Sequence, residues 1–321
     1  MPDSDIAPAR GAERLDLPKG IIPTRISWAN AIPIATIHLL ALLALWPQLF
    51  SWAGLVAFLV GVPLAGQIGV TLCYHRLLAH RSFRVPKWFE RVLVLIALCN
   101  LEGPPGRWVA THRAHHHHAD TQPDPHSPLV NFLWSHIGWM VIREAPLSGV
   151  INYRRYASDI MSDPLYARLE RDALWALVYV AQAALYFLGG FAFGWLSSGD
   201  VGASALLGSS LVVWGVILRT VAVWHITWSV NSLTHMFGYR SHTTDDDSRN
   251  NWVVALLSGG EGWHNNHHAD PISASNQQKW WEIDTTYYMI RGLERIGLAT
   301  NVVHTKAKRQ RARAAKVTTS A

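Results

Sequence analysis

Four long apolar stretches constrain the fold of this chain more than any other feature of its sequence. A helix that crosses a bilayer needs ~20 mostly apolar residues, and only 16% of the 321 residues are charged. The stretches that meet this requirement run over about Trp28–Phe50, Trp52–Leu72, Ala173–Trp195 and Ala203–Val230. They are too long and too uniform for a soluble bundle, and Trp residues gather at their ends as in an aromatic belt. We therefore expect an all-α membrane protein with four transmembrane helices.

The charges of the connecting segments predict the orientation of these helices. The connections PQLFS and SSGDVGAS contain no Lys or Arg, whereas the N-terminal segment, residues 76–172 and the C-terminal tail are rich in both. By the positive-inside tendency, both termini and the long middle segment are cytoplasmic. His75 and His235 then lie just past the cytoplasmic ends of the second and fourth helices. Every His-rich stretch falls on that side of the membrane.

The remaining segments divide the chain into three parts. Residues 1–25 are polar, contain prolines and lack the apolar core of a secretory signal, which predicts a disordered cytoplasmic lead. Residues 26–300 would form one membrane domain, with a cytoplasmic helical cap made from residues 73–172 and 231–300. Residues 301–321 form a basic tail suited to anionic lipid headgroups. The net charge of +6 is therefore attributed to lipid and partner contacts, and nucleic acid is not expected as a partner.

Two smaller apolar features complete the prediction. The run Val92–Leu101 is too short to span a bilayer and suits a helix that lies on the interface or is buried. Cys73 and Cys99 have no CxxC partner, so we expect reduced thiols in apolar surroundings.

Histidines form the most unusual pattern in the chain. They occur in four clusters, HRLLAH, HRAHH, NSLTH and HNNHH, whose candidate ligands are His75, His80, His112, His115, His116, Asn231, His235, His264, His267 and His268. Spacings of i, i+3 and i+4 in the second and fourth clusters put the rings on one helical face. His75 and His80 are about 140° apart on a straight α-helix. They reach one ion only if the helix is distorted or one side chain reaches across.

This number of imidazoles indicates two metal ions, because one zinc ion would need at most four ligands. Imidazole suits Zn, Cu, Fe and Ni alike, so the ligand type does not name the metal. Glu261 precedes His264 in a single Glu-x-x-His match, and we expect it to orient an imidazole by accepting its N–H. Asp120 and Asp270 fit the same supporting role.

Other polar residues are expected to have ordinary roles. His117 and His118 extend the second cluster beyond its repeated spacing, so we expect them at the surface. His38 and His225 lie within the apolar stretches and are interpreted as structural. The DDD run at 245–247 is interpreted as a solvated loop.

Taken together, these motifs resemble those of the membrane fatty acyl desaturases, the group that includes stearoyl-CoA delta-9 desaturase. The three histidine boxes HRLLAH, HRAHH and HNNHH occur in order, with NSLTH between the second and third. The flanking segments DPHSP, WSHIGWM and EGWHNNHHADP match as well. The resemblance covers residues 55 to 300 approximately.

The resemblance implies a di-iron centre (Fe²⁺) bound almost wholly by histidine. One iron would be held by His75, His80, His112, His116 and His267. The other would be held by His115, His235, His264 and His268, with Asn231 contacting it through a water. The fold implied is a stem of four transmembrane helices and a cytoplasmic cap that holds the metals, which agrees with the topology inferred from charge.

The activity implied is an O2-dependent oxidoreductase that inserts a cis double bond, at delta-9, into a saturated acyl chain. In the family, aromatic and hydroxyl residues near the boxes line the substrate tunnel, and the matching residues here are Trp108, Thr227 and Trp228. The alternative is that these Trp residues only pack the cap.

The chain departs from acyl-CoA-using animal members at two places. Ala110–Thr111 stands where they have an Arg-Asp pair, and Glu102 stands where they have a tunnel Gln. The head group of the substrate therefore stays open between CoA, acyl carrier protein and an intact lipid. Without a fused haem domain or a nucleotide-binding Gly motif, we expect electrons from a separate ferredoxin or small cytochrome and its reductase. The basic cytoplasmic face would steer such an acidic partner.

Two other functions compete with desaturation. A hydroxylase or other lipid oxygenase could use the same scaffold and metals. A membrane metal carrier could also be His-rich, but carriers place their ligands at mid-membrane along a path, whereas these clusters lie beyond the ends of the apolar stretches.

Overall fold

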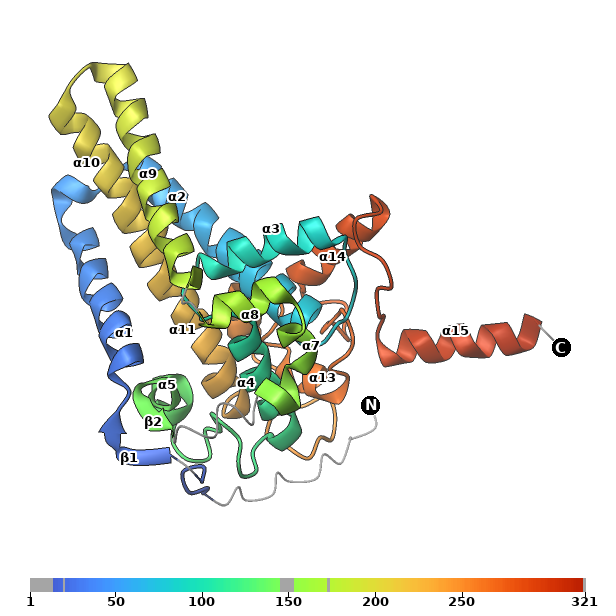
Figure 1. Ribbon diagram of the computed structural model, residues 1–321. Helices are drawn as coiled ribbons and strands as arrows, with labels where there is room; N and C mark the ends of the chain where they lie inside the picture. Colours follow the sequence, from blue (N-terminus) through green and yellow to red (C-terminus); the bar gives the residue numbers. More distant parts are fainter. Residues whose placement is uncertain (1–13, 20, 145–152, 172–173, 320–321) are drawn as a thin grey trace.

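The computed structural model describes residues 14–19, 21–144, 153–171 and 174–319, and their regular secondary structure is almost entirely helical (Figure 1). Ala173, the predicted start of the third span, and the first thirteen residues of the lead lie outside them. In chain order the elements are β1 Ile21–Ile26, α1 Trp28–Ala41, η1 Leu42–Leu45, η2 Pro47–Leu49, α2 Trp52–Val62, η3 Pro63–Ala79, α3 Lys87–Leu98, α4 Pro105–His118, η4 Trp134–Gly138, α5 Trp139–Val141, β2 Ile142–Glu144, α7 Ser158–Met161, α8 Pro164–Arg171, α9 Leu174–Ser198, α10 Val201–Val212, η5 Val213–Leu218, α11 Arg219–Ser232, η6 Leu233–His235, α12 Trp252–Ser258, α13 His264–Ala269, α14 Thr285–Arg295 and α15 Lys306–Thr319.

Four helical rods are long and apolar enough to cross a bilayer. They are Trp28–Leu45, Trp52–Ala79, Leu174–Ser198 and Val201–His235. Their large apolar side chains point outward, as at Leu45 and Leu196, which are 80% and 85% exposed. Each Å² of apolar surface left in water is unfavourable by ~25 cal/mol, whereas lipid tails cover such surface. The chain is therefore a multi-pass membrane protein, as predicted.

The second and fourth rods are longer than the sequence suggested. They continue to Ala79 and His235, so His75 and His235 lie on the rods themselves and not past their ends. The extra turns are enclosed by the cap, where Tyr74 and Thr234 are fully buried. Buried backbone groups need hydrogen-bond partners, and continued helix supplies them.

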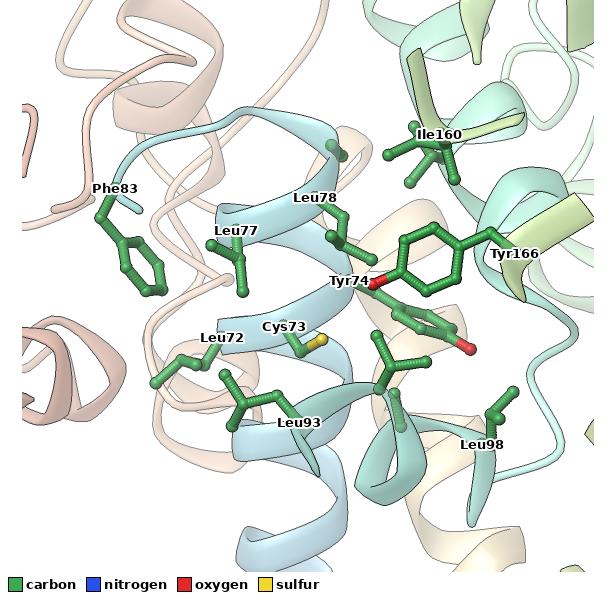
Figure 2. Packing of buried hydrophobic residues seen from close by; sticks show 14 of the residues in the cluster. Leu72, Cys73, Tyr74, Leu77, Leu78, Phe83, Leu93, Leu98, Ile160 and Tyr166 are labelled. Carbon is green, nitrogen blue, oxygen red and sulfur yellow. The ribbon is translucent and has the colours of Figure 1, made fainter. Parts of the chain in front are cut away.

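The cap has its own apolar core around the end of η3 (Figure 2). Leu72 and Leu77 of η3 pack in one buried cluster with Leu93 of α3, Leu98 at its end and Tyr166 of α8. A fully buried side chain of this size stabilises the fold by ~1.5–3 kcal/mol. This core fixes the orientation of the η3 turns that carry the first histidine box.

α3 runs across the rods rather than along them (Figure 1). Leu93 and Leu98 face the core, while Trp88 and Leu95 on the other side are 62% and 52% exposed. A helix that is apolar on its exposed side and lies across the bundle suits the membrane interface. This agrees with the expectation for the run Val92–Leu101.

A two-stranded antiparallel sheet was not predicted. β1 pairs with β2, with Ile22 opposite Arg143 and a register shift before Ile26. Residues 21–25, expected to belong to a disordered lead, form most of β1. The pairing joins segments far apart in sequence, so no local pattern indicates it. It ties the start of α1 to the segment that follows α5.

Candidate metal centre

Nine histidine side chains converge in two groups inside the cap. Within each group, the candidate ligand atoms all lie within 4.8 Å of one another. The first group comprises His75, His80, His112, His116 and His267, and the second comprises His115, His235, His264 and His268. The structure thus brings together all nine histidines selected from the sequence, in the two sets that the resemblance implies.

The winding of η3 explains how His75 and His80 reach the same group. η3 is a π-helix, and the His80 N–H donates to the His75 carbonyl oxygen, five residues earlier, at 3.0 Å. Such widened turns are frequent at functional sites. They bring residues i and i+5 onto nearly the same side, and the two ring centroids lie 4.7 Å apart. The distortion that the sequence left open is therefore present.

α4 supplies histidines to both groups. It begins at Pro105, where the missing proline N–H would be unpaired anyway. His112 and His116 belong to the first group and His115 to the second, so the helix runs between them. The ring of Trp108, one turn earlier, stacks on His112 with centroids 5.1 Å apart.

The next two histidines of α4 lie outside both groups, as predicted. His117 is exposed, and its Nε2 is 3.0 Å from Nη2 of Arg155. His118 Nε2 is 3.1 Å from the hydroxyl of Tyr156. These contacts belong to the outer surface of the cap.

A separate row of histidines joins α1, α11 and η4. Nε2 of His38 lies 3.2 Å from Nε2 of His225, whose Nδ1 lies 3.0 Å from Nε2 of His136. His38 Nδ1 also pairs with the carbonyl oxygen of Ile34 at 2.7 Å. These imidazoles bridge elements and satisfy one another, in keeping with the structural role expected for His38 and His225.

Contacts inside the two groups fit bound metal ions better than they fit hydrogen bonds. Nε2 atoms face one another in the pairs His80–His112 at 2.8 Å, His116–His267 at 2.9 Å and His235–His264 at 3.1 Å. The buried Nε2 atoms of His115 and His268 have no hydrogen-bond partner among the described residues, although buried polar atoms are normally paired. A metal ion between the nitrogens would satisfy them together.

The surroundings keep five of these imidazoles neutral, which is the form that binds metal. Burial lowers the pKa of several ring nitrogens well below its usual value, and neighbouring histidines lower it further. This holds for His80, His112, His116, His264 and His267. These five rings are therefore available as ligands at neutral pH.

Four buried or partly buried carboxylates orient the rings from outside. Each lies close to the Nδ1 atom of one histidine: Glu261 to His75 at 2.8 Å, Asp124 to His115 at 3.0 Å, Asp120 to His235 at 2.8 Å and Asp246 to His268 at 2.6 Å. A carboxylate that accepts the Nδ1 proton fixes the tautomer and leaves the Nε2 lone pair for a metal.

These carboxylates are held in the ionised form. Burial would raise the pKa of Glu261, but Arg76 and His75 beside it lower the value to about 2. Burial likewise opposes ionisation of Asp120, Asp124 and Asp246, yet the histidine beside each lowers its pKa below the usual value. The shell around the imidazoles therefore carries negative charge that would offset the charge of bound cations.

Glu261 and Asp120 each lie beside an imidazole Nδ1, at 2.8 Å, as their expected supporting role requires, but two related expectations are wrong. Asp270 accepts from the Lys306 N–H and from Arg309, both at 2.8 Å, and supports the C-terminal segment. Asp246 was placed in a solvated loop and instead contacts a ring of the second group.

Sequence reasoning missed Asp124 and His126. The His126 ring stacks on His115 with centroids 4.4 Å apart. The candidate ligand atoms of His115, Asp124 and His126 all lie within 4.8 Å of one another. Both residues follow α4 in an irregular segment, where no periodic spacing indicates which side chains meet.

A narrow, mainly apolar cavity leads from the histidine groups into the membrane part of the bundle. From one rod it is lined by His75, Thr71, Val70, Gly66 and Val62. The facing wall, from α11, is lined by Asn231, Val230, Thr227, Ile226 and Val223.

Trp108 and Thr227 line this cavity, as predicted for a tunnel, but Trp228 does not. Consecutive residues of an α-helix point about 100° apart, so Trp228 faces another side of α11. There it is buried and stacks on Trp224 with centroids 5.6 Å apart. Asn231 lies outside the two histidine groups and lines the cavity beside them.

Comparison with known proteins decides between the possible uses of this arrangement. The Fatty acid desaturase family profile matches residues 50–301. The chain is 43% identical over 278 residues to an sn-1 stearoyl-lipid 9-desaturase of Anabaena variabilis, covering 87% of this chain and 94% of the relative. It is 44% identical over 278 residues to a protein of the same description from Synechocystis sp., covering 86% and 80%. An acyl-CoA 5-desaturase of Anemone leveillei is 42% identical over 273 residues, covering 85% and 78%.

The chain belongs to the membrane fatty acid desaturase family. This desaturase is accordingly an oxidoreductase of lipid metabolism, and its histidine groups form a candidate metal site of that enzyme class.

In this desaturase, Glu102 forms hydrogen bonds with two side chains that line the cavity. Its two carboxyl oxygens accept from the Thr227 hydroxyl at 2.8 Å and from the Trp108 indole N–H at 3.1 Å. Burial raises the pKa of Glu102 to about 7, and these two hydrogen bonds only partly oppose the rise. The carboxyl thus joins two cavity-lining side chains from elements far apart in sequence.

Glu102 should make the stability of the desaturase depend on pH. Its folded pKa of about 7 exceeds the ordinary value of 4.5, so between these values the unfolded chain loses a proton that the folded chain keeps. Stability due to this group is highest below pH 4.5 and falls by at most about 3 kcal/mol as pH rises through 7. We compare the melting temperature of Glu102→Gln with that of wild type at pH 5 and at pH 8. The difference, variant minus wild type, should be several degrees larger at pH 8 than at pH 5.

Thermal unfolding of both purified proteins in detergent at the two pH values measures this difference. The comparison removes contributions from histidines, which both proteins share. An unchanged difference between pH 5 and pH 8 would show that Glu102 is already ionised at pH 5.

Proposed function

We propose that this desaturase holds two iron ions in its histidine groups and uses O2 to insert a cis double bond at position 9 of a saturated acyl chain. The observation that carries the proposal is the pair of histidine groups at the end of an apolar cavity. We assign His75, His80, His112, His116 and His267 to one iron and His115, His235, His264 and His268 to the other. Asn231 would contact the second iron through a water.

The nature of the acyl substrate follows from the relatives. Two of them are described as sn-1 stearoyl-lipid 9-desaturases, which supports position 9 and an acyl chain carried on a lipid. The relative described as an acyl-CoA 5-desaturase makes acyl-CoA the competing substrate. We also place both termini and the metal site on the cytoplasmic side, because the connections at the opposite ends of the rods lack Lys and Arg.

Iron bound in these groups would supply an oxidant, made from O2 and two electrons, that is strong enough to break an unactivated C–H bond. The acyl chain gives up two hydrogen atoms as its double bond forms. With two further protons and two electrons, O2 leaves as two water molecules. The electrons would come from a separate ferredoxin or small cytochrome with its reductase.

The residues of the chain position the substrate. Each buried methylene contributes ~0.8 kcal/mol, so the apolar walls draw the chain in and exclude water. A saturated chain has no polar group near its midpoint, so shape alone decides which carbons face His75 and His112 at the metal end. The bridge from Thr227 through Glu102 to Trp108 holds the walls at that point.

Lipid analysis in a host that lacks its own desaturase tests the proposal. We expect a new cis monounsaturated chain, with mass spectrometry placing the double bond at carbon 9 and fractionation placing it in membrane lipid. A hydroxylated chain would support an oxygenase instead, and unchanged lipids with altered cell metal content would support a carrier. If the monounsaturated product appeared first in the acyl-CoA pool, the substrate would be acyl-CoA and not a membrane lipid.

The far end of the cavity should limit chain length. Val62 lies at the membrane end of the lining, opposite Val223. Val62→Trp would fill this end, so we expect the product ratio of 16-carbon to 18-carbon chains to rise about tenfold, which corresponds to ~1.4 kcal/mol. Val60→Trp is the matched control, because Val60 is 57% exposed on the outer side of the same helix. Equal ratios in both variants would mean that the chain does not reach Val62.

A further inference from the structure

The first histidine group comes close to the outer surface of the cap on the side away from the cavity. His80 and His116 are only partly buried, and neither lines the acyl cavity, whereas His75 and His112 do. The residues that follow them, Arg81 and His117, are on the exterior: the Arg81 side chain is 63% exposed and His117 is exposed. This surface therefore lies within one residue of two candidate ligands of the first group, His80 and His116.

A basic hollow lies on this surface. It is lined by Arg81, Arg113, Arg155, Tyr156, Ser158 and Asp159. Asp159 is the only carboxylate in this lining, and it is paired with both Arg81 and Arg113. Three guanidinium groups against one carboxylate leave the hollow with a net positive charge.

Two of the three arginines are exposed enough to meet a partner. Arg113 is fixed from several sides, because it also donates to the carbonyl oxygens of Leu78 and Ala79. Arg81 is largely exposed, and the exposed Arg155 contacts His117 at 3.0 Å and lies over the Tyr156 ring at 5.2 Å. His117 is the immediate neighbour of His116 in the first group. A partner that contacts Arg155 would therefore be separated from the candidate iron ligand His116 by a single residue, His117.

We propose that this hollow, with Arg81 and Arg155 as its contacts, is the docking surface for an acidic one-electron carrier protein. The proposal rests on the proposed function, in which each turnover needs two electrons from outside the chain. Positive charge on the hollow would raise the rate of encounter with an acidic carrier and orient it. Its position then places the carrier's redox centre next to the His80 and His116 side of the first group.

An anionic head group of the acyl substrate is the competing occupant. The hollow and the acyl cavity share no lining residue. They lie on different sides of the first group, with His75 and His112 facing the cavity. A head group bound in the hollow would be separated by these imidazoles from a chain in the cavity, so this occupant is disfavoured.

Charge reversal in the full-length desaturase tests the proposal. The double variant Arg81→Glu/Arg155→Glu is compared with Lys306→Glu/Lys308→Glu, which places the same charge change on exposed residues of α15. The probe is a purified acidic [2Fe–2S] ferredoxin with its reductase. We expect kcat/KM for ferredoxin to fall at least tenfold only in the hollow variant, and its dependence on salt to flatten. Iron content and KM for the acyl substrate should stay unchanged.

A single turnover with chemically reduced enzyme separates the possible failures. Dithionite-reduced wild type and hollow variant should form equal amounts of product, because neither needs the carrier. No product from reduced wild type would refute the proposed function itself. Equal ferredoxin kinetics in wild type and hollow variant would refute the docking surface, as would equal losses in both variants. A raised KM for the acyl substrate would assign the hollow to the head group.

Discussion

Cells that rely on the His268→Ala variant for unsaturated lipid should contain no monounsaturated product. His268 is one of only four histidines in the second group, so its loss leaves three ring ligands for that ion. The change also leaves the Asp246 carboxylate, 2.6 Å from Nδ1 of His268 in the native chain, without its partner. Bound iron should fall from about two ions per chain to about one, and product analysis together with metal analysis of the purified protein measures both effects.

His118→Ala is the matched control for this experiment. It removes the same kind of side chain from another His-rich helix, α4, but the described contacts of the His118 ring are with Tyr156 and His117, outside both groups. We expect it to keep most of the activity and both metal ions. Normal desaturation by His268→Ala would overturn the ligand assignment, whereas equal loss in both variants would point to general destabilisation of α4 and α13.

The second large effect is expected from Asp246→Asn, which leaves every histidine in place. An amide has the same shape as the carboxylate but no charge, and it no longer fixes which nitrogen of His268 carries the proton. Loss of such a supporting carboxylate lowers metal affinity or activity by about 10- to 100-fold. Activity measured against added Fe²⁺ should show a weaker apparent affinity, with partial recovery at high iron concentration.

Asp245→Asn provides the comparison, because Asp245 is the exposed neighbour of Asp246 and lies outside the candidate metal groups. It should behave as wild type in the same titration. If Asp246→Asn also matched wild type, the contact between Asp246 and His268 would have no part in metal binding.

The parts of the structure that sequence could predict are those carried by local patterns. Four apolar stretches predict four rods because length and hydropathy alone decide whether a helix can span a bilayer. The i, i+3, i+4 spacing of His112, His115 and His116 likewise predicts a common face, since helix geometry is the same in every protein. Both predictions depend only on residues close together in the chain.

The parts that were missed depend on contacts between distant segments. Asp246 reaches His268 from a loop 22 residues earlier in the chain, and β1 pairs with a strand more than a hundred residues away. The π-helical turns before His80 depend on packing within the cap, so spacing alone left open whether His75 and His80 meet. Trp228 was placed in the tunnel with Thr227, although neighbours on a helix point in different directions.

The rod from Trp52 to Ala79 contributes lining residues along the whole length of the cavity. It carries both the membrane end of the cavity, at Val62, and the first ring of the metal site, at His75. Substitutions on it can therefore shorten or lengthen the space for the methyl end without moving the reacting carbons. In the proposed function, chain length would be set at the Val62 end of this rod and the reacting carbons at the His75 end.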